Sequence, residues 1–445
     1  MFYCLYSKIM YEKSKIYLDE FSKYVIMQPF PFVVDLKNSH GMWIHTVDDD
    51  ELFDWCGYYG SKFIGHNHPK MFEPAYVEKL VYAANNKMAN PDFLTPECVE
   101  YYRKLYELAP KCMVNPDLEI YAVNSGAEAI ENLLKYFINL YDAKMQAQNK
   151  SIGAKRVIYF DQAFHGRTIF TLNITQLSHV PIINRNFEHM TVDNIKIPFP
   201  AIDIYKHEEE NLKVINESLA ILRKEIEAAP DEIVGIIVEP IQGAGGHRAT
   251  YAYFFQELSK IAHEFDISLG FDEVQTAGGQ TGTFFAVDSF NLPYPPMGIA
   301  SGKKLANGVI YMHHPMEDLG ILDSTWGGNL ADMVRFCQEM KVIEEENLQE
   351  KIAEKADILL EGLTQLKKKY PDKIRNIRGM GLYLGFSLVN PKNLVPLVEY
   401  AQDHEKLILL EAGTDSIRFR PTMDVTEAEI TLMLEILDRC LNTLN

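Results

Sequence analysis

The sequence predicts an α/β protein whose main domain is built on a mostly parallel β-sheet. Between residues 71 and 330, short apolar runs that are typical of buried strands alternate with segments of helical periodicity. Such alternation places helices on both faces of a parallel sheet. Beyond residue 330 the pattern changes to a long helical run and then short strands, which indicates a separate α+β domain. We expect the large domain over residues 71–330 and a smaller domain made from residues 1–70 and 331–445.

Each element is predicted from its own run of residues. Six apolar runs of the central region are expected strands: Leu118–Val123, Arg156–Phe160, Ile233–Val238, Ile267–Phe271, Met297–Ser301 and Val309–Met312. The main helical segments there are Lys70–Ala84, Ala127–Leu140, Asn211–Ala229 and Tyr253–Phe265. In the smaller domain we expect a hairpin of Phe32–Leu36 with Gly41–Asp48, a long helical run with one break over Leu330–Lys369, a strand over Leu382–Phe386 and a helix over Thr426–Leu444.

Composition excludes several classes of protein. The 445-residue chain has a net charge of -19, whereas a nucleic-acid or anionic-membrane partner requires basic patches. No run of about 18 apolar residues could span a bilayer, and the start, Met1–Lys8, lacks the basic flank of a signal peptide. The six cysteines contain no CxxC pair, so we expect reduced thiols. The sequence therefore predicts a soluble, cytoplasmic protein, and we identify no metal site in it.

The stretch from Ile267 to Lys303 carries the main chemical signal. The apolar run Ile267–Phe271 is followed at once by Asp272, and the next apolar run is followed by Lys303. The carboxyl ends of parallel strands meet at one edge, where ligands bind in open α/β sheets. A lysine there could form an imine with an aldehyde cofactor, and a buried carboxylate could pair with a protonated ring nitrogen, which is how pyridoxal phosphate is held. The alternative is that Lys303 and Lys304 form a solvated turn.

Three more motifs follow predicted strands. Asn124–Ala129 opens a helix with small residues, so its backbone N–H groups could approach a phosphate, although Ser125 could equally be an ordinary N-cap. Phe164 could stack on a heteroaromatic ring, and Arg167 could grip a carboxylate, unless they are a core residue and a surface ion pair. Glu239 directly follows the run that ends at Val238.

A last motif, Ser416–Pro421, alternates so that Arg418 and Arg420 share one face of a strand. We expect at most one of the two arginines to bind substrate and the other to be structural.

In this order, the motifs resemble those of the class III (subgroup II) pyridoxal-phosphate aminotransferases of fold type I. The resemblance covers nearly the whole chain and is sharpest in Asn124–Ala129, Phe164–Arg167, Glu239–Gly246, Phe271–Gly282 and Arg418–Pro421. Ser324–Arg335 and Gly302–Lys304 are most similar to lysine 6-aminotransferases, ahead of 4-aminobutyrate aminotransferases. The resemblance implies a large domain with a mostly parallel seven-stranded sheet, plus a smaller α+β domain from both termini.

The resemblance also implies roles for individual residues. Lys303 would hold pyridoxal phosphate as an internal aldimine and then move the proton between substrate and cofactor. Asp272 would keep the ring nitrogen protonated, which makes the ring an electron sink. Phe164 would stack on the ring next to His165, and Gln275 would contact the ring hydroxyl.

The phosphate would be bound by the start of a helix and by a second subunit. Ser125, Gly126 and Ala127 would bind it from one subunit and Thr325 from the other. That sharing implies a homodimer whose active sites are built by both chains.

Substrate binding is implied by two arginines and one departure from the family pattern. Arg167 would hold the far carboxylate of an ω-amino acid, Arg418 would hold 2-oxoglutarate, and Glu239 would be a third substrate-binding residue. In the family, a glutamate in a Gln-Gly-Glu-Gly-Gly segment covers or uncovers the arginine that matches Arg418, as the site changes between the amine donor and the oxo acid. This chain has Ala244 at that place, so its carboxylate switch is absent in the usual form.

The leading hypothesis is therefore an ω-aminotransferase that moves the terminal amine of lysine, or of a similar ω-amino acid, to 2-oxoglutarate. Ala244 motivates a second hypothesis, an amino-acid racemase or epimerase on the same fold, which needs no switch between two substrates. A non-catalytic cofactor-binding protein is a third. A nucleotide-binding Rossmann protein is a fourth, although Gly243–Gly246 lacks the GxGxxG spacing.

Overall fold

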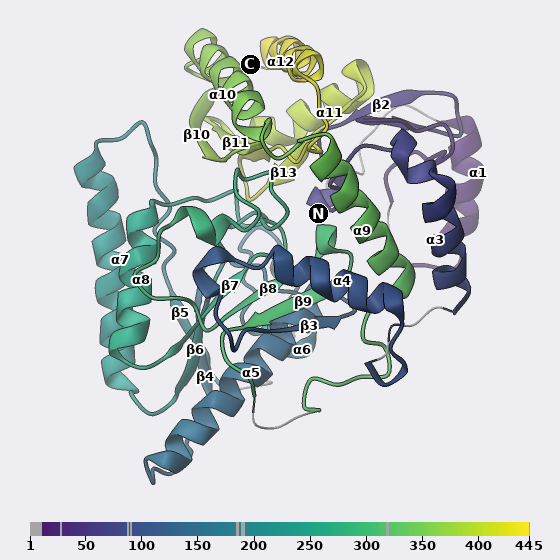
Figure 1. Ribbon diagram of the computed structural model, residues 1–445. Coiled ribbons are helices and arrows are strands. Elements are labelled where there is room, and N and C mark those ends of the chain that lie inside the picture. The colour runs from purple at the N-terminus through teal and green to yellow at the C-terminus, as the bar shows by residue number, and fades with distance from the viewer. Residues whose placement is uncertain are drawn as a thin grey trace. The chain divides into compact units, whose positions relative to one another are not determined.

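The computed structural model describes residues 11–26, 29–86, 89, 91–183, 187, 192–316 and 320–444 (Figure 1). The chain divides into two compact units, Ala75–Lys341 and Met1–Pro74 with Val342–Asn445. Domain limits after residues 70 and 330 stay a prediction. The start, Met1–Lys8, and Cys4 lie outside the described residues.

The larger unit is organised around one sheet, which is seven-stranded within the described residues. Its strands are β3 (Glu119–Val123), β4 (Arg156–Phe160), β5 (Ile195–Ile197), β6 (Ile233–Val238), β7 (Ser268–Asp272), β8 (Gly298–Ser301) and β9 (Gly308–Met312). They lie in the order β3-β9-β8-β7-β6-β4-β5, and β9 is antiparallel to both its neighbours while the other pairs are parallel. The predicted α/β fold with a mostly parallel sheet is confirmed.

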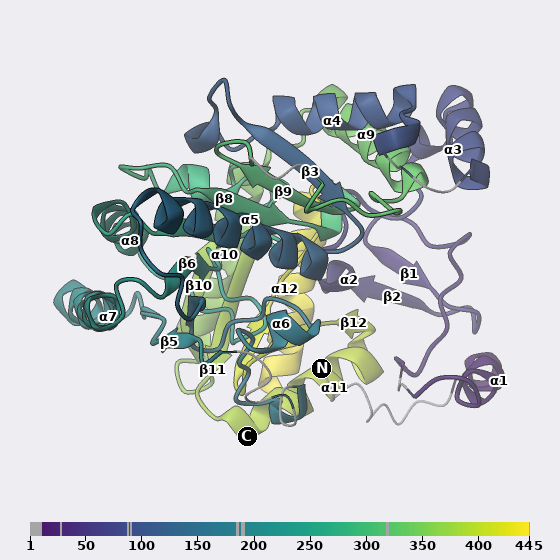
Figure 2. The same ribbon diagram turned by 90° about the horizontal axis from the view of Figure 1, so that it is seen from below.

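Helices cover the two faces of this sheet. The helices that pack on its strands are α4 (Pro96–Glu107), α5 (Gly126–Ala147), α7 (Glu208–Ala228) and α8 (Ala252–Glu264). The unit also contains α3 (Pro74–Asn86) and α6 (Ile169–Leu172), and α9 (Leu330–Glu345) runs across the limit between the units. Helix α5 lies along one face (Figure 2).

Glycines in three strands let α5 approach that face closely. A Cβ on Gly235 or Gly270 would come within 2.4 or 2.8 Å of the Phe137 ring, and one on Gly298 within 2.4 Å of Leu133. The neighbour of Gly270, Phe271, contacts Phe255 of α8, with ring centroids 5.7 Å apart. Because successive side chains of a strand point to opposite faces, α5 and α8 cover opposite sides of the sheet.

The smaller unit is an α+β structure drawn from both ends of the chain. Its helices are α1 (Glu12–Phe21), α2 (Gly57–Gly60), α10 (Ile352–Lys369), α11 (Leu394–Glu405) and α12 (Glu427–Asn442). Its strands are β1 (Trp43–His45), β2 (Glu51–Asp54), β10 (Ile374–Met380), β11 (Tyr383–Leu388), β12 (Leu407–Ile408), β13 (Leu410–Ala412) and β14 (Ser416–Arg418). Within the described residues they form sheets in the orders β1-β2-β12 and β10-β11-β14-β13.

The hairpin predicted near the N-terminus is confirmed only as a short antiparallel contact. Val34 forms a bridge with Thr46, and the N–H of Asp35 donates to the carbonyl of His45 at 2.8 Å. The longer ladder runs between β1 and β2, a pairing that the sequence did not predict. The β2 strand carries two acidic residues, so its sequence did not stand out as apolar, but Leu52 and Phe53 are fully buried in it. Burial of the strand was decided by packing and not by its composition.

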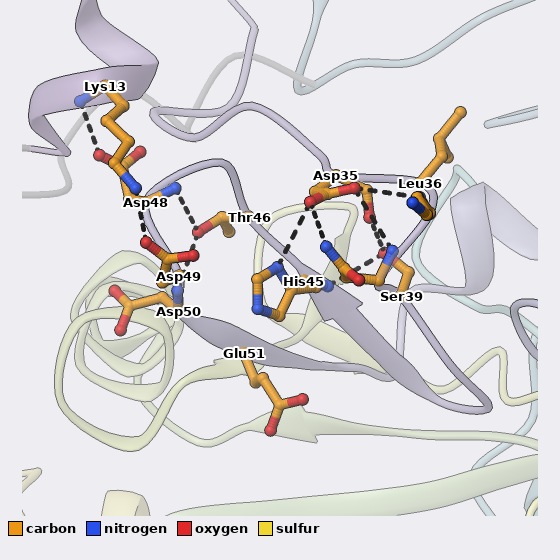
Figure 3. A network of polar contacts seen from close by, with 12 residues as sticks. Lys13, Asp35, Leu36, Ser39, His45, Thr46, Asp48, Asp49, Asp50 and Glu51 are labelled. Atoms are coloured by element: carbon orange, nitrogen blue, oxygen red, sulfur yellow. Dashed lines mark hydrogen bonds and ion pairs between the residues drawn. The ribbon is translucent and has the colours of Figure 1, made fainter.

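Polar contacts attach α1 to the turn between β1 and β2 (Figure 3). The backbone N–H of Lys13 donates to Asp48 at 2.7 Å, and the N–H of Ser14 donates to the same carboxylate at 3.0 Å. Asp50 accepts from Lys406 at 2.9 Å. The acidic run Asp48–Asp50 therefore serves as an anchor for neighbouring segments.

Two further features bear on the predicted class of protein. No helix of the described part of the chain is long and apolar enough to cross a bilayer. Cys56, Cys98, Cys112, Cys337 and Cys440 are in no disulfide within that part.

Candidate active site

A buried carboxylate–imidazole pair lies at the carboxyl edge of the large sheet. Asp272 ends β7, and one of its oxygens lies 2.7 Å from Nδ1 of His165, which follows β4. The other oxygen accepts the N–H of Val274 at 3.0 Å. The two side chains are 4 and 0 % exposed, so the pair is shielded from water and interacts strongly.

The second ring nitrogen of His165 lacks a hydrogen-bond partner among the described residues. Nε2 is buried and has no hydrogen-bond partner among the described residues, whereas the backbone N–H of His165 donates to Thr175 at 2.9 Å. Buried polar atoms are rarely left without a partner, so an unsatisfied one at a strand edge indicates a place for a ligand or water. Thr175, buried in a loop, had no signal in the sequence.

Glu239 joins this group from β6, the strand that lies between β4 and β7. It is 8 % exposed, and one oxygen accepts the N–H of Phe164 at 2.9 Å. Burial raises the pKa of Glu239 to about 7, and the charge of Asp272 adds to the rise, while His165, the Phe164 N–H and Lys303 oppose it. The four side chains of Glu239, His165, Asp272 and Lys303 therefore act on one another electrostatically.

The two adjacent lysines have separate positions. Lys303 starts a short 3-10 helix (Lys303–Leu305) directly after β8, and its φ of 51° is in the left-handed region. Lys304 is buried, and its Nζ donates to the carbonyl of Gln275 at 2.9 Å. Left-handed backbone costs a residue with a side chain about 1–2 kcal/mol, so Lys303 is held in a strained conformation at the end of β8.

The first turn of α5 is closely packed, and the first two backbone amides of the helix have no hydrogen-bond partner among the described residues. Ser125 is the N-cap and accepts the N–H of Glu128 at 3.2 Å, so the N-cap alternative holds for its side chain. The N–H groups of Gly126 and Ala127 make no hydrogen bond among the described residues. A Cβ on Gly126 would come within 2.6 Å of Val274, and one on Gly302 within 3.1 Å of Gly126. The strand ends and this helix start are therefore in direct contact.

The other predicted residues of the larger unit are more open. Phe164 is half-buried, and the guanidinium of exposed Arg167 lies 5.9 Å from its ring centroid. Gln275 is half-buried and Thr325 is exposed. Their predicted contacts to a cofactor or substrate are not tested by this arrangement.

Arg418 and Arg420 belong to the smaller unit and differ in surroundings. Arg420 lies beyond the end of β14, with its guanidinium 4.3 Å from the Tyr383 ring and one N–H donated to the carbonyl of Phe419 at 2.7 Å. Burial lowers the pKa of Arg420 to about 9, and Arg418 adds to that. Arg418 acts on Glu411 of β13, where burial raises the carboxyl pKa and the guanidinium opposes the rise. Arg420 is thus the arginine built into packing.

The fold is that of an enzyme of the aminotransferase type. A model of the family "Aminotransferase class-III" matches residues 26–441, and the chain belongs to that family. It therefore acts on amino acids and oxo acids, by transfer of an amino group.

Several relatives are similar over most of their length. An L-lysine-epsilon aminotransferase from Amycolatopsis lactamdurans is 29 % identical over 94 % of this chain and 93 % of its own. One from Mycobacterium bovis is 30 % identical over 91 % of each chain. A 4-aminobutyrate aminotransferase from Kluyveromyces lactis is 26 % identical over 98 and 96 %.

Solved structures agree with the fold. A lysine aminotransferase from Mycobacterium tuberculosis superposes with a TM-score of 0.91 and 28 % identity, covering 97 % of this chain and all of that one. An omega transaminase from Pseudomonas jessenii, 20 % identical with a TM-score of 0.81 over 96 and 98 % of the chains, shares the fold. The resemblance drawn from the motifs is confirmed.

Proposed function

We propose that the protein is a pyridoxal-phosphate-dependent ω-aminotransferase that moves the terminal amino group of lysine, or of a similar ω-amino acid, to 2-oxoglutarate. The names of the lysine relatives and the 91–94 % of the chain over which they match support the donor class. The observation that carries the proposal is the buried Asp272–His165 pair with Lys303 close enough to act on the same group of charges.

The residues present suit pyridoxal phosphate. The carboxylate of Asp272 suits a protonated ring nitrogen, and the amides of Gly126 and Ala127 at a helix start suit a phosphate. The Lys303 amine suits the aldehyde. When bound, this cofactor supplies an electron-withdrawing ring that stabilises negative charge on the carbon that loses a proton.

The protein residues then have the following tasks. Asp272 holds a proton at the ring nitrogen, and His165 fixes the carboxylate in place through its 2.7 Å contact. Phe164 packs against the ring and excludes water. Lys303 would move the proton between the substrate carbon and the cofactor carbon, for which its amine must be neutral.

Substrate binding rests on two arginines in the proposal. Arg167 binds the carboxylate far from the reacting amine, and Arg418 binds the oxo acid. Ala244 cannot neutralise Arg418, and Glu411 is an acid on the neighbouring strand with which Arg418 interacts. A donor with its own second carboxylate would also satisfy Arg418.

We further propose a homodimer in which Thr325 reaches the phosphate of the partner's site. An exposed apolar surface of the larger unit supports this, on α3 and on the segment before α4. Its residues are Val77, Val81, Tyr82, Phe93 and Leu94. Large apolar side chains exposed on one segment in this number are typical of protein interfaces. Analytical ultracentrifugation tests the dimer, and a sedimenting mass equal to that of one chain would contradict it. Location in the cytoplasm stays a prediction.

The decisive experiment combines a spectrum with a donor screen. Purified protein with pyridoxal phosphate should show the absorption of a lysine-bound cofactor, and Lys303→Ala should lose both this absorption and turnover, while Lys304→Ala keeps the absorption. Lysine, ornithine and 4-aminobutyrate are tested as donors with 2-oxoglutarate. The cofactor claim fails if Lys303→Ala leaves the spectrum unchanged, and the ω-amine claim fails if all three donors are inert.

Ala244 favours one second candidate, an amino-acid racemase or epimerase. Incubation of one lysine enantiomer without an oxo acid distinguishes the two, because loss of optical rotation without any oxo acid requires racemisation.

A further inference from the structure

Glu239 contacts the segment that carries two residues of the proposed cofactor site. It directly follows β6, and its Oε1 accepts the backbone N–H of Phe164 at 2.9 Å. Phe164 comes after β4, the next strand in the sheet. The hydrogen bond therefore links the loop that follows β4 to the end of β6.

The same segment is also held from the other side. The ring of His165 contacts Asp272 of β7 at 2.7 Å, and its N–H donates to Thr175 at 2.9 Å. Phe164 and His165 are adjacent residues, so a displacement of one backbone amide moves the other. A chain of contacts therefore links Glu239, through the Phe164 amide and the His165 ring, to Asp272.

The surroundings of Glu239 suit a group that can act as an acceptor with or without a proton. Its second oxygen has no hydrogen bond among the described residues. The charged and titratable groups that act on it are His165, Asp272 and Lys303. Burial raises the pKa of this carboxyl to about 7, yet a carbonyl oxygen remains to accept the Phe164 N–H in either state.

We propose that Glu239 is a positioning residue, whose hydrogen bond to the Phe164 amide sets the placement of the Phe164 ring and of the His165–Asp272 pair in the cofactor site. The hydrogen bond is what matters, and the negative charge of Glu239 is not required. The statement about the cofactor rests on the proposed function, whereas the statement about the loop does not.

Three substitutions at one position separate hydrogen bonding from charge. Glu239→Gln keeps an oxygen at the same reach and removes the charge. Glu239→Asp keeps the charge but is one carbon shorter, so it cannot reach the amide. Glu239→Ala removes both, and Glu273→Gln is the matched control, because Glu273 is also a buried glutamate that accepts backbone N–H groups, at Ala286 and Val287.

The first measurement is hydrogen–deuterium exchange of the peptide that contains Phe164, in the purified protein. Loss of one buried hydrogen bond should speed exchange about tenfold in the Asp and Ala variants, while the Gln variant and the Glu273→Gln control match the wild type. The Asp and Gln pair decides the question even where the Ala variant does not fold.

The second measurement is the rate of pyridoxal phosphate release after dilution, followed by its absorbance. Release should be about tenfold faster in the Asp variant and within about threefold of wild type in the Gln variant. Equal exchange in all variants, or a Gln variant that behaves like the Ala variant, overturns the proposal. If wild-type protein binds no cofactor, the proposed function fails, while the exchange experiment still decides the role of Glu239 in the loop.

Discussion

Two buried glutamates at the same edge of the sheet have similarly raised pKa values but different hydrogen-bond partners. Glu239 follows β6, Glu273 follows β7, and burial raises the pKa of each to about 7. Glu273 has three donors, the hydroxyl of Thr276 at 2.6 Å and the amides of Ala286 and Val287 at 3.0 and 2.8 Å. Glu239 has one donor and three charged neighbours.

The difference teaches how to tell a structural acid from one at a site. Glu273 closes the loop that runs from Thr276 to Val287, and its local partners use both of its oxygens. Glu239 keeps one oxygen open beside His165, Asp272 and Lys303. A raised pKa alone does not distinguish the two, whereas the number of donors and the kind of neighbours do.

The largest effect should come from Glu273→Ala. It leaves two buried amides and a hydroxyl without an acceptor, so we expect the free energy of unfolding to fall by about 3–5 kcal/mol. Urea unfolding followed by tryptophan fluorescence measures this. A loss below about 1 kcal/mol would show that water replaces the carboxylate and that the loop does not depend on it.

The pH dependence of stability should distinguish the variants next. A carboxyl with a folded pKa of about 7 and an unfolded value near 4.5 binds its proton more tightly in the folded state. Stability therefore falls as pH rises from about 4.5 to 7, by up to about 3 kcal/mol for each such group, and is level above that window.

Glu273→Gln should remove one of the two contributions. We expect it to start less stable at pH 5, because its amide N–H₂ faces the Ala286 N–H, but to lose about 2–3 kcal/mol less than wild type between pH 5 and 7. Urea midpoints at four pH values measure this. Parallel curves for the two proteins would show that Glu273 is ionised throughout.

A smaller loss of stability is expected from Glu239→Ala. It deprives a single backbone amide of its acceptor, so unfolding at pH 6 should become easier by about 1–2 kcal/mol, less than for Glu273→Ala. Turnover should nevertheless fall more in the Glu239 variant, when compared at a temperature where both are folded. The reverse ranking in activity would remove the distinction between the two residues.

The smallest effect should come from Thr276→Val. This change keeps the side-chain shape and deletes one donor to Glu273, which should cost about 1 kcal/mol and raise the pKa of that carboxyl further. The matched change Thr283→Val deletes a hydroxyl that donates to the carbonyl of Phe285 and should leave the pH dependence unaltered. Equal pH curves for Thr276→Val and wild type would contradict the assignment.

Much of the fold could be predicted because buried strands appear in the sequence as short apolar runs. β4 and β6 begin and end where the apolar runs Arg156–Phe160 and Ile233–Val238 do, since both are buried on two faces by helices. The three-residue β5 was missed, because Ile195–Ile197 is too short and has an exposed lysine at its centre. The parallel pairing of β2 with β12, a strand more than 350 residues away, could not be read from local sequence.

The site was predictable in outline for a related reason. Asp272, Glu239 and the Phe164–His165 segment each follow an apolar run, and parallel strands bring their carboxyl ends to one edge. The contacts among them were not predictable, because hydrogen bonds between loops depend on side-chain directions that no spacing specifies. The contact of His165 with Asp272 and that of Glu239 with the Phe164 amide are two such hydrogen bonds.

The sequence by itself determined most strands and helices of the large domain, the residues that follow those strands, and the family to which the chain belongs, because periodicity and motif order are local properties. Tertiary structure alone decided that Lys304 is held by a carbonyl while Lys303 acts on the acids of the edge, and that Glu239 and Glu273 have different partners. The roles of adjacent or similar residues are distinguished only by their burial and by contacts with residues of distant strands. These contacts form only when the sheet has folded.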